Sequence, residues 1–411
     1  MKILLLTQYY PPEVGAAQNR LSALVRSCRR RGISVTVLTA MPNYPTGRVS
    51  DQYRTRWMIR EIQDGVDVIR TWIWPRPGNG WLSRGLTYSS FALSSLVTGW
   101  LHAPRTDLLI WETPPLVLGP TAYLLSRFKG ARLVTNVSDL WPASLTALGV
   151  LREGFLLRIL KNLEEFVYRK SAAISGQTEH IATDIRNRVP EVPVILWRNG
   201  VDARAFAHGD ATTWRVRWHV PAGHFVVGYA GLFGISQGLE VICHAASQLC
   251  NIPVTFVMVG HGPSKQGLID LASRLGLTNF LWIPSCPHEE MPGIWRAFDC
   301  AVVCLRNLPL FRGAVPSKMY EAMAAGVPII LGVKGEAAEV IRDSGAGITV
   351  EPENADQMAN AIGTLHADPA GGRQMGENGR RAAHTLYDRE AINGRYIDGL
   401  LRALHVDTTL P

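Results

Sequence analysis

A serine, a lysine and a glutamate lie close together in the segment Pro316–Pro328, PSKMYEAMAAGVP. Small residues follow them and Gly326 is a typical helix end, so the segment predicts a helix that begins near Ser317. The first turn of a helix has unpaired N–H groups and a partial positive charge, which suit a phosphate. Lys318 would add a cation there, and Glu321, one turn further, could accept hydrogen bonds from a ribose diol. The segment indicates a nucleotide site, with an ordinary strand–helix unit as the alternative.

Two glycine-containing loops have the same arrangement, in which a predicted strand precedes the loop and a helix follows it. They are residues 11–17, PPEVGAA, and residues 228–238, GYAGLFGISQG. Glycine and alanine let the backbone come close to a ligand, and the helix start favours an anion. The residues that we expect at the ligand are Gly15 in the first loop, and Gly231, Gly234 and Gln237 in the second. A plain structural turn is the alternative for the first loop, and neither loop has the Gly-Lys-Ser/Thr ending of a Walker A loop.

Two acids of the N-terminal half, Asp139 and Glu13, could take part in catalysis. Asp139 follows the predicted strand Leu133–Asn136, and its carboxylate could face an acceptor hydroxyl at the carboxyl end of that strand. Alternatively, Asp139 caps the turn into residues 140–142, since aspartate is a strong capping residue. Glu13 lies in the first glycine loop, where it could equally be a solvated loop residue.

The composition is that of a globular chain with a large core. The 411 residues are 47% hydrophobic and 18% charged, and 42 lysines and arginines against 34 acids give a net charge of +8. This charge suits phosphorylated substrates or anionic lipid. It is not interleaved with aromatic residues in an RNA-binding pattern, so we expect no nucleic-acid partner. The six cysteines are scattered without a C-x-x-C pair, which favours a reducing, cytoplasmic compartment and indicates no metal site.

Short apolar runs alternate with helical patterns along the whole chain, which predicts parallel sheets covered by helices on both faces, the α/β class. The runs predicted as strands are Ile3–Leu6, Ser34–Leu38, Val66–Arg70, Leu108–Trp111, Leu133–Asn136, Ala172–Ile174, Val194–Leu196, Phe225–Tyr229, Val254–Val259, Phe280–Ile283, Ala301–Leu305, Ile329–Leu331 and Gly347–Val350. The predicted helices include Asn19–Arg31, Phe155–Lys170, Leu239–Leu249, Gly267–Leu275, Glu289–Arg296, Ser317–Ala325 and Ala355–Leu365.

The length and the pattern predict two doubly wound, Rossmann-like domains. The turn-rich residues 197–202, WRNGVD, end the first series, so we expect domains at residues 1–200 and 201–385. Residues 386–411 are expected to form a C-terminal helix that packs back on the first domain. Two such domains in tandem place a ligand crevice between the carboxyl ends of both sheets.

Taken together, the motifs resemble the family 4 glycosyltransferases of GT-B architecture over nearly the whole chain. The segments that carry the resemblance are Pro11–Gly15, residues 29–39, Asn199–Asp202, Gly228–Gly231, Val259–Pro263, Pro316–Lys318 and Glu321–Pro328. Residues 137–142, VSDLWP, with Leu148-Gly149, resemble the bacterial group that builds colanic acid, O-antigen and capsule repeat units.

The resemblance implies a retaining glycosyltransferase that moves a hexosyl or N-acetylhexosaminyl group from a nucleoside-diphosphate sugar, with UDP as the expected nucleotide. The implied acceptor is a saccharide or a polyprenyl-diphosphate-linked sugar, bound by the N-terminal domain, while the C-terminal domain binds the donor. Such enzymes need no metal and no cofactor besides the nucleotide-sugar co-substrate, and no Asp-x-Asp motif occurs here. The resemblance also places the nucleobase at the strand end Trp282–Ser285, which includes Pro284.

The chain departs from the family pattern at positions that bind the donor. Gly313 stands where the usual Glu-x7-Glu signature has its first glutamate. Leu232 and Gln237 replace the usual pyrophosphate-binding Arg and Lys of the glycine loop. Lys318, Arg312 or the N–H groups of a helix start could compensate. The alternatives left open are a non-catalytic nucleotide-sugar-binding subunit and a GT-B-type sugar-nucleotide epimerase.

The region between residues 70 and 101 could contact a membrane. Its tryptophans and flanking cations suit a lipid interface; they are Trp72-Ile73-Trp74, Trp81-Leu82, Arg70, Arg76 and Arg84. The uncharged stretch Gly85–Leu101 falls short of a membrane span, and its alternative interpretation is an apolar helix packed on the first sheet. We expect peripheral contact with the inner face of the cytoplasmic membrane, because the resembling group works on polyprenyl-diphosphate sugars.

Overall fold

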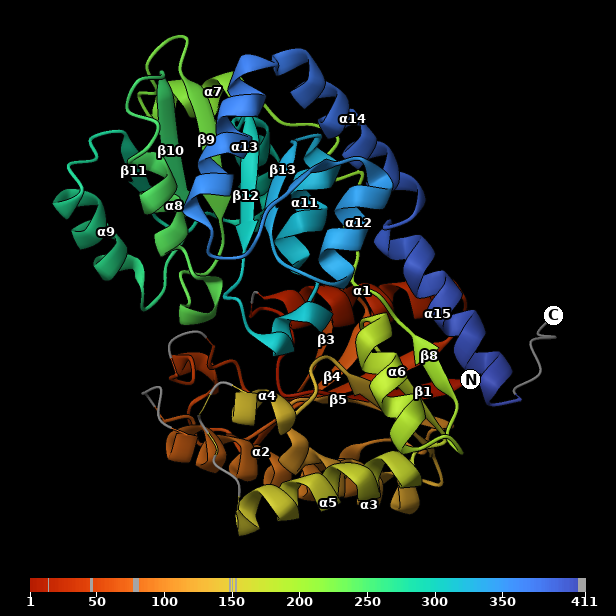
Figure 1. The fold of residues 1–411 in the computed structure, drawn as a ribbon. Coiled ribbons are helices and arrows are strands. Elements are labelled where there is room, and N and C mark those ends of the chain that lie inside the picture. The colour runs from red at the N-terminus through yellow and green to blue at the C-terminus, as the bar shows by residue number, and fades with distance from the viewer. Residues whose placement is uncertain are drawn as a thin grey trace. The chain divides into compact units, whose positions relative to one another are not determined.

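The computed structural model describes residues 1–13, 15–44, 47–76, 81–147, 149, 151 and 154–405. The chain divides into two compact units (Figure 1). The first contains Met1–Arg198 and the end of the chain from Ile392, and the second contains Asn199–Ala391. The boundaries that we expected, at 200/201 and 385/386, lie near these divisions.

The first unit is built on an eight-stranded sheet in the order β3-β4-β2-β1-β5-β6-β7-β8. Neighbouring strands are parallel except β3, which is antiparallel to β4, so the carboxyl ends of the other strands meet at one edge. The strands are β1 (Lys2–Leu6), β2 (Ser34–Ala40), β3 (Met58–Gln63), β4 (Val66–Thr71), β5 (Leu108–Thr113), β6 (Arg132–Val137), β7 (Ala173–Gly176) and β8 (Val194–Leu196).

The predicted strands of this half are all present, because central parallel strands are buried on both faces and read as continuous apolar runs. Every residue of β5, for example, is buried. The strand that the sequence analysis missed is β3, MIREIQ, in which apolar and polar residues alternate and none is buried. This is the pattern of an edge strand, and it lacks the continuous apolar run by which we recognised the others.

Helices cover both faces of the first sheet. One core contains side chains of α1 (Ala16–Arg30) and α15 (Arg389–Ala403). The core on the other face contains side chains of α2 (Trp81–His102), α3 (Gly119–Lys129) and α5 (Phe155–Lys170), which Figure 1 shows side by side. The remaining helices of this unit are α4 (Ala143–Ala147) and α6 (Glu179–Arg188), with short 3₁₀ helices η1 (Asp51–Tyr53) and η2 (Leu116–Leu118).

The end of the chain completes the core of the first unit. Tyr396 of α15 stacks on Trp197 with ring centroids 4.5 Å apart, and both side chains are buried. The Trp197 indole donates to Asn393 Oδ1 at 3.0 Å, and Asn393 in turn donates to Ser27 Oγ of α1 at 3.2 Å. These buried hydrogen bonds join α15 to α1, which lies at the start of the chain.

The membrane-facing role expected for Arg70 is wrong. Its side chain is fully buried, pairs with Glu61 at 2.6 Å and donates to the carbonyl of Pro11. The stretch Gly85–Leu101 lies within α2, which packs on the sheet as the alternative interpretation expected. Within the described residues, no helix is both long and apolar enough to cross a membrane. The side chains of Trp81 and Leu82, and residue Leu148, lie outside the described part of the chain.

The second unit contains a six-stranded, wholly parallel sheet in the order β11-β10-β9-β12-β13-β14. Each of its strands was predicted from an apolar run. The strands are β9 (Phe225–Ala230), β10 (Val254–Val259), β11 (Phe280–Ile283), β12 (Cys300–Cys304), β13 (Ile329–Gly332) and β14 (Gly347–Thr349).

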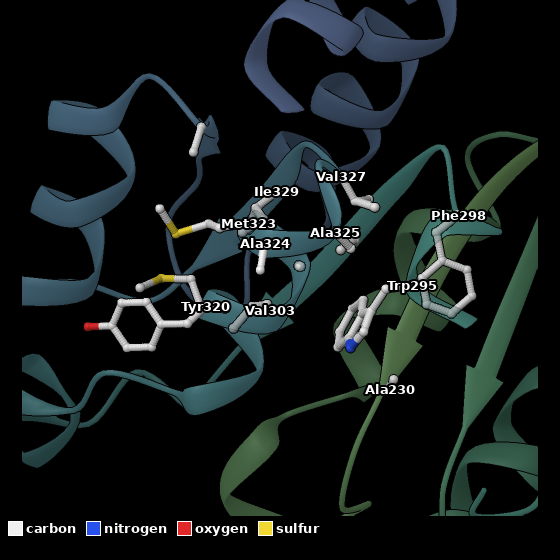
Figure 2. Close-up of a cluster of buried hydrophobic side chains, with 14 of the residues drawn as sticks. Ala230, Trp295, Phe298, Val303, Tyr320, Met323, Ala324, Ala325, Val327 and Ile329 are labelled. Atoms are coloured by element: carbon white, nitrogen blue, oxygen red, sulfur yellow. The ribbon is translucent and has the colours of Figure 1, made fainter. Parts of the chain in front are cut away.

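Helices again cover both faces of this sheet. They are α7 (Ala211–Arg217), α8 (Glu240–Ala246), α9 (Lys265–Arg274), α10 (Met291–Arg296), α11 (Ser317–Ala325), α12 (Glu336–Ser344), α13 (Ala355–Ala367) and α14 (Pro369–Thr385), with 3₁₀ helices η3 (Ile235–Gln237), η4 (His288–Glu290) and η5 (Pro309–Gly313). The core in Figure 2 contains Trp295 of α10 together with Tyr320, Met323 and Ala324 of α11. Helix α11 ends at Gly326, whose φ of 75° is left-handed, as the sequence predicted. Because one face of α11 is packed in this core, the position of the first turn of the helix is fixed.

Candidate functional site

The second unit brings Lys318 of α11 to the glycine loop that follows β9. Lys318 Nζ donates to Gln237 Oε1 at 2.9 Å and to Tyr229 Oη at 2.7 Å. It also lies close to Gly231, where a Cβ would be 2.9 Å from Nζ, and Gly231 has a φ of 146° that other residues rarely adopt. Lys318 and the loop residues Gly231 and Gln237, which were predicted from two separate motifs, therefore form one cluster at the carboxyl end of β9.

The ammonium group of Lys318 is poorly solvated. Burial lowers its pKa to about 8, since a charged amine is less stable away from water. An ammonium group has three N–H donors, and Tyr229 and Gln237 accept two of them, so one donor remains for a ligand. Among the described residues no carboxylate forms an ion pair with Lys318. An anion at this position would gain a charge-assisted hydrogen bond.

The start of α11 adds a second feature that favours an anion. Ser317 is the first residue of this nine-residue helix, and no side chain caps its first turn. The Met319 N–H donates to the Pro316 carbonyl at 3.1 Å, and the helix dipole gives this turn, which includes Lys318, a partial positive charge. Together with Lys318, this first turn can hold a phosphate or diphosphate group.

Glu321 lies one turn into α11 and is held by a tryptophan that the sequence analysis missed. Trp295 Nε1 donates to Glu321 Oε2 at 3.0 Å, and Trp295 is fully buried. Glu321 itself is only partly buried, so the carboxylate is oriented from inside the core and can accept further hydrogen bonds. A single indole N–H gives no motif in sequence, and only the packing of α10 on α11 shows the contact.

The other predicted donor-site residues lie at the same edge of the second sheet. Gly234 precedes η3, and Pro284 directly follows β11 and is exposed. The loop around Gly231 is held closely against the loop after β10, because a Cβ at Gly260 would be 2.0 Å from the carbonyl oxygen of Gly231. Phe233 N also donates to the His261 carbonyl at 2.7 Å. Gly313, at the position of the missing acid, is buried in η5.

In the first unit, Glu13 is neither solvated nor loosely held. It is only 6% exposed, and its Oε1 accepts from the backbone N–H groups of Asn43 and Tyr44, both at 2.7 Å. Burial raises the pKa of this carboxyl, and the two hydrogen bonds oppose that rise. This geometry is that of a brace between two loops. Gly15, two residues along, directly precedes α1 in an extended conformation.

Asp139 follows β6 at the carboxyl edge of the first sheet. Its carboxylate accepts hydrogen bonds from the Ser144 hydroxyl and the Leu140 N–H, so it interacts with the start of α4 as the capping interpretation expects. Burial nevertheless raises the pKa of Asp139, which is only partly covered. A carboxyl with this environment can serve as a cap and also face an acceptor hydroxyl.

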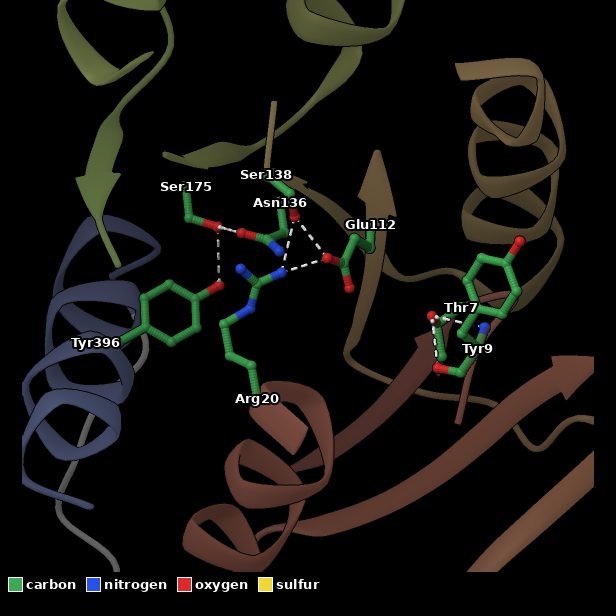
Figure 3. A network of polar contacts seen from close by, with 8 residues as sticks. All are labelled: Thr7, Tyr9, Arg20, Glu112, Asn136, Ser138, Ser175 and Tyr396. Atoms are coloured by element: carbon green, nitrogen blue, oxygen red, sulfur yellow. Dashed lines mark hydrogen bonds and ion pairs between the residues drawn. The ribbon is translucent and has the colours of Figure 1, made fainter. Parts of the chain in front are cut away.

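A buried ion pair supports the strand end that carries Asp139 (Figure 3). Arg20 of α1 pairs with Glu112 of β5 and also donates to Ser138 Oγ at 2.7 Å, while the Ser138 hydroxyl donates to Glu112. The guanidinium group of Arg20 lies 5.0 Å from the centre of the Trp197 ring. The sequence analysis missed this network because Arg20 is about a hundred residues from both Glu112 and Ser138, and neither Arg20 nor Glu112 belongs to a motif. It fixes Ser138, the residue next to Asp139.

The network continues along the sheet but leaves polar atoms without partners. Ser175 donates to Asn136 Oδ1 at 3.0 Å, and its oxygen lies 3.4 Å from the Tyr396 hydroxyl. Glu112 Oε2, Arg20 Nε and Asn136 Nδ2 are buried and have no partner among the described residues. Within that same part of the chain, no three His, Cys, Asp or Glu side chains are grouped as they would be in a metal site.

Comparison with known proteins gives consistent matches for both units. The family model described as "Glycosyl transferase 4-like domain" matches residues 15–200, and that described as "Glycosyl transferases group 1" matches residues 210–382. WcaI of Escherichia coli (strain K12), assigned to colanic acid biosynthesis, is 27% identical over 382 residues, which cover 88% of this chain and 91% of WcaI.

Solved structures share the fold along the whole chain. Sucrose-phosphate synthase of Thermosynechococcus elongatus has a TM-score of 0.78 and 18% identity, with coverage of 98% of this chain and 99% of the other. HepE of Anabaena in complex with UDP-glucose has a TM-score of 0.73 and 20% identity, with coverage of 98% and 100%. At these identities the likeness concerns the fold alone.

Because Arg20 and Glu112 form a buried ion pair, replacing one partner should destabilise the protein more than replacing both. Arg20→Met should lower the free energy of unfolding by about 3–5 kcal/mol, because it leaves the Glu112 carboxylate buried without its cation. The double change Arg20→Met with Glu112→Leu should cost less than Arg20→Met alone. Chemical denaturation of the three proteins measures these differences.

The exposed pair Arg31–Asp398 provides the control, since its side chains are 38% and 53% exposed against 4% and 7% for Arg20 and Glu112. Arg31→Met should cost no more than about 1 kcal/mol. Equal losses for Arg20→Met and Arg31→Met would contradict a supporting role for the buried pair.

Proposed function

Because this chain belongs to the group 1 and 4-like glycosyltransferases of GT-B fold, we propose that it transfers the sugar of a UDP-sugar to a saccharide or polyprenyl-diphosphate-linked acceptor, with retention of configuration and release of UDP. The product is a unit of a surface polysaccharide. WcaI, which is assigned to colanic acid biosynthesis, supports the pathway. The similar HepE structure, which contains UDP-glucose, supports the donor.

The contact between Lys318 and Gln237 carries the proposal. The family loop normally supplies an Arg and a Lys to the donor pyrophosphate, and this chain has Leu232 and Gln237 there. Lys318 reaches that loop from α11 and donates to Gln237 at 2.9 Å. The positive charge missing from the loop is thus supplied by the neighbouring helix, close to the uncapped first turn of α11. This argues against the non-catalytic binding subunit.

The proposed chemistry depends on stabilising the leaving diphosphate. Negative charge develops on the phosphate as the glycosidic bond to the donor breaks, and fixed N–H donors and a cation stabilise that charge most in a poorly solvated site. Lys318 and the α11 N–H groups are placed for this task, and Glu321 binds the ribose. The leaving phosphate accepts the acceptor proton, so Asp139 orients the acceptor hydroxyl and need not act as a strong base.

The acceptor side of the proposal belongs to the first unit. A lipid-linked acceptor implies that the protein works at the inner face of the cytoplasmic membrane.

The epimerase alternative requires an acid–base pair beside the sugar. Glu13, one of the two acids predicted for catalysis, has one carboxylate oxygen occupied by two backbone amides, which argues against such a pair.

Release of UDP from UDP-sugars tests the function. The wild-type protein should bind UDP and hydrolyse one UDP-sugar slowly without acceptor, and Glu321→Gln should weaken UDP binding by about ten- to a hundredfold, as expected for a lost hydrogen bond to a charged group. Trp295→Phe should weaken UDP binding less than Glu321→Gln does, because this change removes only the hydrogen bond that orients the Glu321 carboxylate. Calorimetry with UDP and a UDP-release assay measure both effects.

The matched control for this experiment is Trp218→Phe, which removes the same indole N–H from another buried tryptophan of the same core. It should leave UDP affinity unchanged. A protein that binds UDP-sugars but never releases UDP would be the non-catalytic subunit. An unchanged dissociation constant in Glu321→Gln would reject the ribose assignment.

The lowered pKa of Lys318 predicts that the affinity for UDP, but not for uridine, depends on pH. Since its pKa is lowered to about 8, the ammonium form is lost as the pH rises through that value, and UDP affinity should fall between about pH 7 and 9. Uridine, which has no phosphate, should bind equally over this range. Lys318→Met should bind UDP weakly at every pH and lose the titration; equal losses for uridine and UDP would mean that the lysine is structural.

Asp139 can be tested for catalysis separately from capping. Asp139→Asn keeps a good cap but removes the charge, so turnover should fall strongly while the melting temperature and UDP affinity stay near wild-type values. Asp139→Ala also removes the cap and should cost about 0.5–2 kcal/mol of stability. Normal turnover in Asp139→Asn, with a lowered melting temperature in Asp139→Ala, would show that Asp139 is only a cap.

A further inference from the structure

Helix α2 exposes a row of large apolar side chains on its outer side. Leu93, Val97, Trp100 and Leu101 follow one another at helical spacing and are between 44% and 68% exposed. The opposite side of α2, which includes Phe91, is buried against the first sheet. Soluble proteins rarely leave such a row uncovered.

The apolar row continues over the two neighbouring helices. Trp100 of α2 lies against Phe128 of α3, with ring centroids 6.0 Å apart, and Phe128 is 54% exposed. Tyr123 of α3 meets Phe166 of α5 edge to face at 5.4 Å. Helix α5 then begins with Phe155, which is 78% exposed. We call the outer sides of α2, α3 and α5 the apolar helix surface (Figure 1).

Basic residues accompany this surface and acids are nearly absent from it. Helices α2 and α3 contain no Asp or Glu. The two acids of α5 are engaged, since Glu164 is buried against Arg188 and Glu165 pairs with Arg169. The exposed cations of the three helices include Arg84, Arg127, Arg158 and Lys161.

We propose that the apolar helix surface docks on the headgroup region of an anionic lipid bilayer. Exposed aromatic and aliphatic side chains would enter the interface while the surrounding arginines and lysines meet anionic headgroups. The charge selects this partner over a second copy of the chain, because two identical basic surfaces would repel each other. The inference deepens the proposed function by naming where the first unit meets the membrane, and it rests on that function only for the lipid-linked acceptor.

The structure changes which residues make the contact. Within the segment predicted to touch a membrane, Ile73 is buried and Trp72 is half-buried and stacks on Trp57 with ring centroids 5.7 Å apart, whereas Trp74 is 47% exposed. Helices α3 and α5, which the sequence did not suggest for this role, add the exposed Phe128 and Phe155 to the surface. The proposed contact therefore extends beyond residues 70–101, where the sequence suggested it, to the outer sides of three helices.

Vesicle binding of the full chain tests this proposal. Wild-type protein should sediment with vesicles of phosphatidylcholine containing about one third phosphatidylglycerol, more weakly with phosphatidylcholine alone, and less as salt is raised. The double variant Leu93→Glu with Phe155→Glu should weaken binding by at least about tenfold, because each change removes an apolar contact and adds an acid.

The matched control is Ile62→Glu with Val216→Glu, which adds the same charge at side chains that are 71% and 69% exposed, outside the apolar helix surface. It should change vesicle binding by less than about threefold, and both variants should keep wild-type UDP affinity. Equal losses in both double variants, or no sedimentation of the wild-type protein, would overturn the proposal. So would a dimer in light scattering that only the Leu93 and Phe155 variant dissociates. Vesicle binding by a protein without transferase activity would uphold this inference and reject the proposed function instead.

Discussion

The covering of two parallel sheets on both faces is the constraint on which the rest of the structure depends. Strands such as β5 and β12 are buried from end to end, so polar side chains can reach a ligand only at the carboxyl edge. Lys318 and Asp139 both lie at such an edge. Each is also held by buried neighbours, Tyr229 for the lysine and, through Ser138, the Arg20–Glu112 pair for the aspartate. Burial on the faces thus places the chemistry at the edges.

The same constraint explains how much of the fold could be predicted. Buried parallel strands read as continuous apolar runs, and every predicted run is a strand. The half-exposed edge strand β3 carries an alternating pattern and was missed. Helix α2 was ambiguous for a related reason: it is apolar on its buried side and also on its outer side, so its sequence could not distinguish a packed helix from a lipid contact.

For the candidate site, sequence reasoning succeeded where the residues are neighbours in the chain. Ser317, Lys318 and Glu321 lie within one helix start, whose pattern is readable. It failed for partners brought together only by packing, such as Trp295 with Glu321 and Arg20 with Glu112. It named Lys318 as one of three possible replacements for the missing loop cations, but it could not specify the contact with Gln237, because that contact depends on the packing of α11 against the sheet that carries the loop. Helix packing decides these distances, and single positions carry no signal of it.

The place of α15 has a consequence for how the chain comes to fold during synthesis. The ribosome releases residues 1–198 long before residue 392, yet Trp197 is covered by Tyr396 and bonded to Asn393. Until α15 has left the ribosome, the nascent first unit therefore lacks one wall of its core, and the tryptophan remains uncovered. The second unit, which is continuous in sequence, can fold as soon as it emerges. The second unit can thus be complete before the first, and α15 then covers one face of the first sheet.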